Sequence, residues 1–221
     1  MSLVRRAWAE FLGTAFLLAA VVGSGIMGER LSGGSAAITL LANSLATGFA
    51  LIALIIAFAP RSGAHFNPVV TLALAWRGEF PRGEIAAYLI AQIFGALAGV
   101  LAAHAMFDLP LLQASGTTRT SAAQWWSEAV ATFGLVFVVL SCVRKQAWAA
   151  PWAVGSYIAA AYWFTASTSF ANPAVTIARS FTDTFAGIRP HDGPAFIVFQ
   201  LVGAALAVAV DRSIGTGSSA R

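Results

Sequence analysis

Charged residues are scarce in this chain. Only 10% of its 221 residues are Asp, Glu, Lys or Arg, whereas 58% are hydrophobic. About a quarter of the residues of an average soluble domain are charged. A soluble domain of this length has no way to hide so much apolar surface, so the composition predicts an integral membrane protein.

Cysteine and catalytic patterns are also lacking. A single cysteine, Cys142, excludes an internal disulfide, and its place near the end of an apolar stretch favours simple packing. The histidines His104 and His191 form no metal-binding pattern with it. We find no nucleophile paired with a base, no phosphate-binding loop and no nucleic-acid motif. The sequence therefore argues against an enzyme, and we expect no cofactor, no metal and no nucleic-acid partner.

Long hydrophobic runs are abundant. About 20 apolar residues are needed to cross the hydrocarbon core of a bilayer. Six runs reach that length, at 7–27, 36–58, 83–107, 121–143, 149–167 and 193–213. The first run carries no small-residue cleavage signature, so we expect a spanning helix and not a removed signal peptide. The fold class predicted is an all-α membrane protein with six transmembrane helices.

Two further apolar stretches, 67–76 and 172–181, are too short to span a membrane. Each begins with Asn-Pro, at Asn67-Pro68 and again at Asn172-Pro173, 105 positions later (172 minus 67). Asn favours the position before a helix and Pro the first helical position. Short helices inside a bilayer are tolerated only where protein covers their ends or where they line a water-filled cavity. These stretches are therefore predicted to be two half-helices.

The sequence repeats beyond the Asn-Pro pairs, because Glu10 and Glu128 follow tryptophan by two positions in each half, and Gln92 and Gln200 share similar surroundings. Three spans plus one half-helix is an odd number of crossings, so the halves must be inverted. We expect a single channel domain, 1–221, made of repeats 1–112 and 113–221. Inverted repeats with broken helices place their functional site near the midplane.

The distribution of Lys and Arg predicts the orientation. With the N-terminus inside, both termini are cytoplasmic and nine basic residues lie on the cytoplasmic side: Arg5, Arg6, Arg61, Arg77, Arg82, Arg144, Lys145, Arg212 and Arg221. The other four are Arg30, Arg119, Arg179 and Arg189. The half-helices would then enter from opposite faces and meet at the midplane, where their dipoles disfavour cations.

Several polar residues in these segments are candidates for the pore. The amides of Asn67 and Asn172 are expected to donate hydrogen bonds to a neutral solute. Glu10 and Glu128 either accept bonds from backbone N–H groups leading into the half-helices, which we favour, or carry protons. Gln92 and Gln200 suit polar contacts between spans, and His65 is a candidate for lining the inner vestibule.

The motif Ser62-Gly63-Ala64-His65-Phe66-Asn67-Pro68, together with Asn172-Pro173-Ala174 and the repeated Glu and Gln residues, resembles the aquaporin (major intrinsic protein) family. The resemblance covers nearly the whole chain. It implies an aquaporin-like fold of six helices and two half-helices, one pore per subunit and a homotetramer in the bilayer, with small neutral solutes as the transported partners.

The chain departs from the family pattern in two places. Val69 replaces the usual Ala of the first motif, and Val175 stands where water- and glycerol-conducting members usually have Arg. The next arginine, Arg179, lies one helical turn further on, from where it is not expected to stand in for the missing one. Spacing within the family leaves alternatives for the rest of the selectivity filter: Thr47 or Phe49, Ser169, and Ala160 or Tyr162.

A filter without that arginine is expected to be wider and less polar. This is similar to a bacterial aquaporin subgroup linked with arsenic resistance. The resemblance implies passive permeation by arsenous acid, organoarsenicals and related polyol-like solutes, with some water, across the bacterial inner membrane. Two alternatives stay open: a general water or glycerol facilitator, and a proton-coupled secondary transporter that uses Glu10 and Glu128.

Overall fold

The fold is a bundle of long helices around two short ones. The computed structural model describes residues 1–214, apart from the side chains of residues 144 and 145. The cytoplasmic placements expected for the C-terminus and Arg221, and for the side chains of Arg144 and Lys145, therefore lie outside the described residues. The helices are α1 Leu3–Leu31, α2 Ala36–Ser62, α3 Pro68–Arg77, α4 Ile85–Met106, α5 Ala122–Lys145, α6 Ala150–Phe164, α7 Pro173–Arg179 and α8 Gly193–Ile214, with short 3₁₀ turns at Arg82–Glu84 and Ala147–Ala149.

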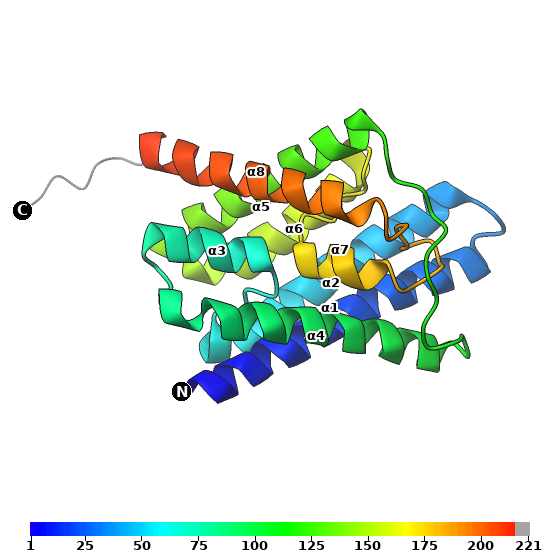
Figure 1. Cartoon of the computed structure of the whole chain (residues 1–221), viewed down its shortest axis with the longest axis horizontal. Coiled ribbons are helices and arrows are strands. Elements are labelled where there is room, and N and C mark those ends of the chain that lie inside the picture. Colours follow the sequence, from blue (N-terminus) through cyan, green and yellow to red (C-terminus); the bar gives the residue numbers. More distant parts are fainter. Residues whose placement is uncertain (215–221) are drawn as a thin grey trace, which may run out of the picture.

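Helix order follows the same pattern in both halves, with two long helices, one short helix and a further long helix. In the first half, α1 packs against α2 and α4, and in the second half α5 packs against α6 and α8. The contact between α2 and α6 joins the two halves. Each short helix also packs on the last long helix of the other half, α3 on α8 and α7 on α4. The short helices α3 and α7 thus lie between the long ones in Figure 1.

Among the described residues, five helices are long and apolar enough to cross a membrane, as expected for a multi-pass membrane protein. The span expected at 149–167 is shorter than predicted, because α6 ends at Phe164 and the chain turns into extended backbone at Thr165. Its 15 residues give a length of about 22 Å, less than a hydrocarbon core of about 30 Å. The apolar residues after Phe164 belong to the loop that leads into α7.

Small residues let the helices approach closely. A Cβ added to Gly95 on α4 would lie 2.3 Å from the carbonyl oxygen of Phe11 on α1, and one added to Gly203 on α8 would lie 2.2 Å from that of Ala129 on α5. Gly48 and Gly155 make the same kind of contact between α2 and α6. Van der Waals packing of this kind drives helix association in lipid, where the hydrophobic effect gives no preference.

The burial pattern is that of a protein whose solvent is lipid. Large apolar side chains such as Phe16, Phe49 and Trp152 are exposed, whereas Glu10, Glu128, Gln92 and Gln200 are completely buried. A polar group in hydrocarbon is costly unless it is hydrogen-bonded. The buried polar side chains therefore mark the places where the interior needs hydrogen-bonding partners, and these lie around the two loops that enter α3 and α7.

Candidate transport pore

Two irregular loops position the starts of α3 and α7. Positive φ angles occur three and one residues before each asparagine, at Ala64 (52°) and Phe66 (49°) in the first loop and at Ser169 (51°) and Ala171 (47°) in the second. Non-glycine residues adopt this conformation only where surrounding contacts compensate its cost of about 1–3 kcal/mol each. The loops must therefore be held from outside.

Glu10 holds the first loop. Its carboxylate accepts hydrogen bonds from the backbone N–H groups of His65 (3.0 Å) and Phe66 (2.7 Å). The Ser62 hydroxyl (2.6 Å) and the Gln92 amide (2.8 Å) also donate to it. The carboxylate thus replaces the water that these groups lack in the membrane.

Glu128 does the same for the second loop. It accepts from the N–H groups of Phe170 and Ala171, both at 2.9 Å, and from the Gln200 amide at 2.6 Å. Gln92 and Gln200 each donate a second bond to a threonine of a half-helix, Thr71 (3.0 Å) and Thr176 (2.9 Å). Glu10 and Glu128 therefore contact the loop backbone, as a supporting role requires, and Gln92 and Gln200 join long helices to half-helices.

The two asparagines cap their own helices and tie the halves together. The Asn67 side-chain oxygen accepts from Val69 N at 3.0 Å, and that of Asn172 accepts from Ala174 N at 3.0 Å. The Asn67 amide donates to the carbonyl of Ala171 and the Asn172 amide to that of Phe66, both at 2.8 Å. Because each amide carries two hydrogens, these bonds use one hydrogen of each asparagine.

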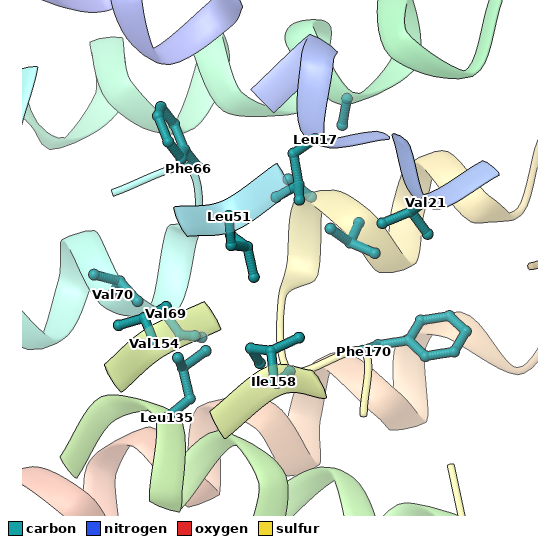
Figure 2. Packing of buried hydrophobic residues seen from close by; sticks show 14 of the residues in the cluster. Leu17, Val21, Leu51, Phe66, Val69, Val70, Leu135, Val154, Ile158 and Phe170 are labelled. Atoms are coloured by element: carbon teal, nitrogen blue, oxygen red, sulfur yellow. The ribbon is translucent and has the colours of Figure 1, made fainter. Parts of the chain in front are cut away.

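A cavity runs past both asparagines. Its wall includes Asn67 and Asn172 together with apolar side chains from α1, α2, α5 and α6. Figure 2 shows several of these side chains, among them Leu17, Leu51, Leu135 and Ile158, converging from different helices on a common space. Pro68 and Pro173 are the first residues of their half-helices, and Val69 and Ala174 are completely buried behind this wall. The cavity wall is therefore mostly apolar, and the two asparagines add polar groups to it.

Four of the candidate filter residues border the cavity: Thr47, Tyr162, Ser169 and Val175. The Thr47 and Tyr162 hydroxyls lie 3.2 Å apart. The alternatives Phe49 and Ala160 are exposed and absent from the cavity wall. Residues two apart on a helix point about 200° away from each other, so a helix that presents Thr47 and Tyr162 to the pore turns Phe49 and Ala160 outward.

His65 also borders the cavity. Its Nδ1 lies 3.0 Å from the Thr71 hydroxyl, and its ring packs against the rings of Phe80 and Tyr88. These contacts fix the imidazole at the side of the passage where α2 ends. His65 is thus on the cavity wall, and its role in an inner vestibule stays a prediction.

The cavity wall also contains a charged residue that was not expected there from the sequence. Arg179 borders the cavity although it lies a full turn beyond Val175. The four candidate filter residues include no cation, but Arg179 on the same cavity wall is one. The signal available in the sequence was the i, i+4 spacing, which places Arg179 on the same helix face as Val175.

The chain is similar to known membrane channels. Residues 1–149 match the model of the family described as "Major intrinsic protein". The chain is 56% identical to aquaglyceroporin AqpS of Rhizobium meliloti (strain 1021) over 210 residues, which is 95% of this chain and 90% of AqpS. It is 35% identical to aquaporin Z of Rhodopseudomonas palustris over 162 residues, covering 66% of this chain and 67% of that protein.

A solved structure shares the fold. The X-ray structure of the aquaglyceroporin from Plasmodium falciparum superposes with a TM-score of 0.76 over 97% of this chain and 98% of that one, at 21% identity. Sequence and fold comparisons thus point to the same class of protein. The chain belongs to the major intrinsic protein family of membrane channels.

Proposed function

We propose that this chain is a passive channel for small neutral hydroxylated solutes, with arsenous acid and organoarsenicals as leading substrates and with some water. The observation that carries the proposal is Val175 on the cavity wall, beside Thr47, Tyr162 and Ser169. A valine there leaves room and supplies no hydrogen-bond donor. Solutes larger than water can therefore enter the ring.

The polar groups of the ring suit hydroxylated solutes. The Ser169 hydroxyl is buried and has no hydrogen-bond partner among the described residues, and the Thr47 and Tyr162 hydroxyls share a single contact. A buried hydroxyl without a partner is costly, and a passing hydroxylated solute would supply one. The name of the relative AqpS, an aquaglyceroporin, supports the same solute class.

The proposal also covers the oligomeric state of the channel, its membrane and its orientation. By family resemblance the pore lies within each subunit of a homotetramer in the bacterial inner membrane. The bias of Lys and Arg supports cytoplasmic termini, and the repeated helix order supports an inverted duplication at 1–112 and 113–221. Cross-linking of the reconstituted protein would measure the subunit number, and cysteine labelling from each side of the membrane would measure the orientation.

The test is stopped-flow permeability of proteoliposomes to water, glycerol and arsenous acid. We expect the wild type to conduct all three and Val175→Arg to retain water while glycerol and arsenous acid flux falls at least about tenfold, since Arg fills the ring. Val175→Leu is the control for side-chain size without charge. A wild type that passed water but excluded both larger solutes would contradict the proposal.

The same vesicles separate the alternatives. A general water or glycerol facilitator would conduct glycerol and exclude arsenous acid. A proton-coupled transporter would lose uptake when a protonophore collapses the proton gradient. The engagement of Glu10 and Glu128 with loop N–H groups favours uptake that does not depend on the gradient.

A further inference from the structure

Arg179 is a buried cation without a counter-ion. The side chain is 2% exposed, and no carboxylate lies within ion-pair distance of it in the part of the chain that the structure describes. Its guanidinium carbon lies 3.4 Å from the centroid of the Phe170 ring, and its Nε donates to the carbonyl of Ala186. A buried charge is costly unless it is paired, so its presence here calls for a reason.

A neighbouring arginine shows what a purely supporting role looks like. Arg119 also lies near Phe170, with its guanidinium carbon 5.0 Å from the ring centroid. Its side chain donates to three backbone carbonyls, those of Gly187 (2.9 Å), Ser167 (3.2 Å) and Phe185 (3.4 Å). Arg119 is not part of the cavity wall, whereas Arg179 is. The Arg179 side chain, by contrast, has one hydrogen bond among the described residues, from its Nε to the carbonyl of Ala186.

The geometry of α7 directs Arg179 towards the filter. Helix α7 begins at Pro173 and ends at Arg179. Side chains of a helix point back towards its N-terminus, and residues four apart share a face. The long Arg179 side chain therefore extends back over the turn that carries Val175, and both residues border the same cavity.

We infer that Arg179 is a selectivity-determining residue: it is a fixed cation on the cavity wall, which excludes cations and offers N–H donors to neutral solutes beside Val175. The charge stands one turn away from the ring instead of within it. Width and charge are thereby separated, because Val175 leaves the ring open while Arg179 sets the electrostatic barrier. This inference rests on the proposed function, since a wide filter is what makes a separate barrier necessary.

The test compares two probes that differ mainly in charge, urea and the guanidinium ion. Urea permeability is measured by stopped-flow light scattering of proteoliposomes. Guanidinium and Na⁺ currents are measured across planar bilayers that contain the same protein. We expect the wild type to pass urea with negligible guanidinium current, and Arg179→Gln to raise that current at least about tenfold while urea flux stays within a few-fold, because a nearby fixed charge is removed.

Three variants serve as controls. Arg179→Lys keeps the charge and should keep guanidinium out. Arg179→Met keeps a long chain against Phe170, and is a second neutral variant in case Arg179→Gln does not fold. Arg30→Gln is the matched control: Arg30 is exposed, its guanidinium carbon lies 5.1 Å from the Phe107 ring centroid, and it borders no part of the cavity. Its loss should leave every flux unchanged.

The outcomes distinguish the inference from the proposed function. A wild type that passes urea, with neutral Arg179 variants that still exclude guanidinium, overturns the inference and leaves the proposed function standing. A wild type that excludes urea, glycerol and arsenous acid overturns the proposed function. If the wild-type pore excludes these solutes, the Na⁺ current tests the inference about Arg179. A larger Na⁺ current in Arg179→Gln and Arg179→Met supports the cation barrier, and an unchanged current overturns it.

Discussion

Replacing Glu128 with Gln should loosen the second pore loop. The carboxylate accepts from Phe170 N, Ala171 N and the Gln200 amide, all in the buried interior. An amide in its place turns one acceptor into a donor. At least one N–H group then loses its partner, and the remaining bonds lose the strength that an ionised acceptor gives.

The expected cost follows from the number of bonds affected. Hydrogen bonds to charged groups contribute roughly 1.5–3 kcal/mol each, and an orphaned buried donor costs about 1–3 kcal/mol. Losing one such bond and weakening two predicts destabilisation of about 3 kcal/mol. For a chain of this length that corresponds to a fall in Tm of roughly 6–12 °C.

The assay is thermal unfolding of the purified protein in detergent, followed by tryptophan fluorescence. Glu29→Gln is the matched control, because the exposed Glu29 carboxylate accepts from one loop N–H group, that of Phe185, at 3.0 Å. The free energy of unfolding of Glu29→Gln should fall by less than about 1 kcal/mol, since water replaces the lost hydrogen-bond partner. If Glu128→Gln and Glu29→Gln shifted Tm equally, the argument that Glu128 holds the loop would be refuted.

Two further predictions concern the helix contacts and the filter. Gly95→Ala should destabilise the protein by about 1–3 kcal/mol, because the new Cβ would lie 2.3 Å from the backbone oxygen of Phe11. Gly83→Ala is the control and should not destabilise it, because no atom lies within 4 Å of the new Cβ. The same unfolding assay measures both variants. Equal Tm values for the two variants would contradict the close packing. Tyr162→Phe removes the hydroxyl that lies 3.2 Å from Thr47 Oγ1. Glycerol permeability should therefore fall a few-fold in stopped-flow measurements, while Tm changes little. An unchanged ratio of glycerol to water permeability would place Tyr162 outside the filter.

Local rules predicted the half-helices from the sequence. Asn67 and Asn172 precede α3 and α7, and Pro68 and Pro173 open them, because N-capping and the fixed φ of proline depend only on neighbouring residues. The ends were less accurate: the second half-helix ends at Arg179, two residues before the predicted limit. Composition and run length likewise predicted long apolar helices, although the run at 149–167 gave a helix of only 15 residues.

The sequence alone did not determine which residues of α2 and α6 face the cavity. Spacing left Thr47 against Phe49 and Ala160 against Tyr162 undecided, because a change of two residues in a loop length rotates the helix face that meets the pore. The place of Arg179 was missed for a related reason. Sequence position fixes where the Cα lies, but the reach and direction of a long side chain depend on the packing around it, here against Phe170.

The paired asparagine bonds impose an order on assembly. All acceptor and donor groups around Glu10 come from the first four helices and their loops, so a nascent chain can complete that network as soon as α4 has been made. The acceptor of the Asn67 amide is Ala171, and α8 covers α3, so both arrive only near the end of translation. The contacts that complete the wall around the two half-helices therefore need the second half of the chain, and a chain that ended after α4 would lack both of them.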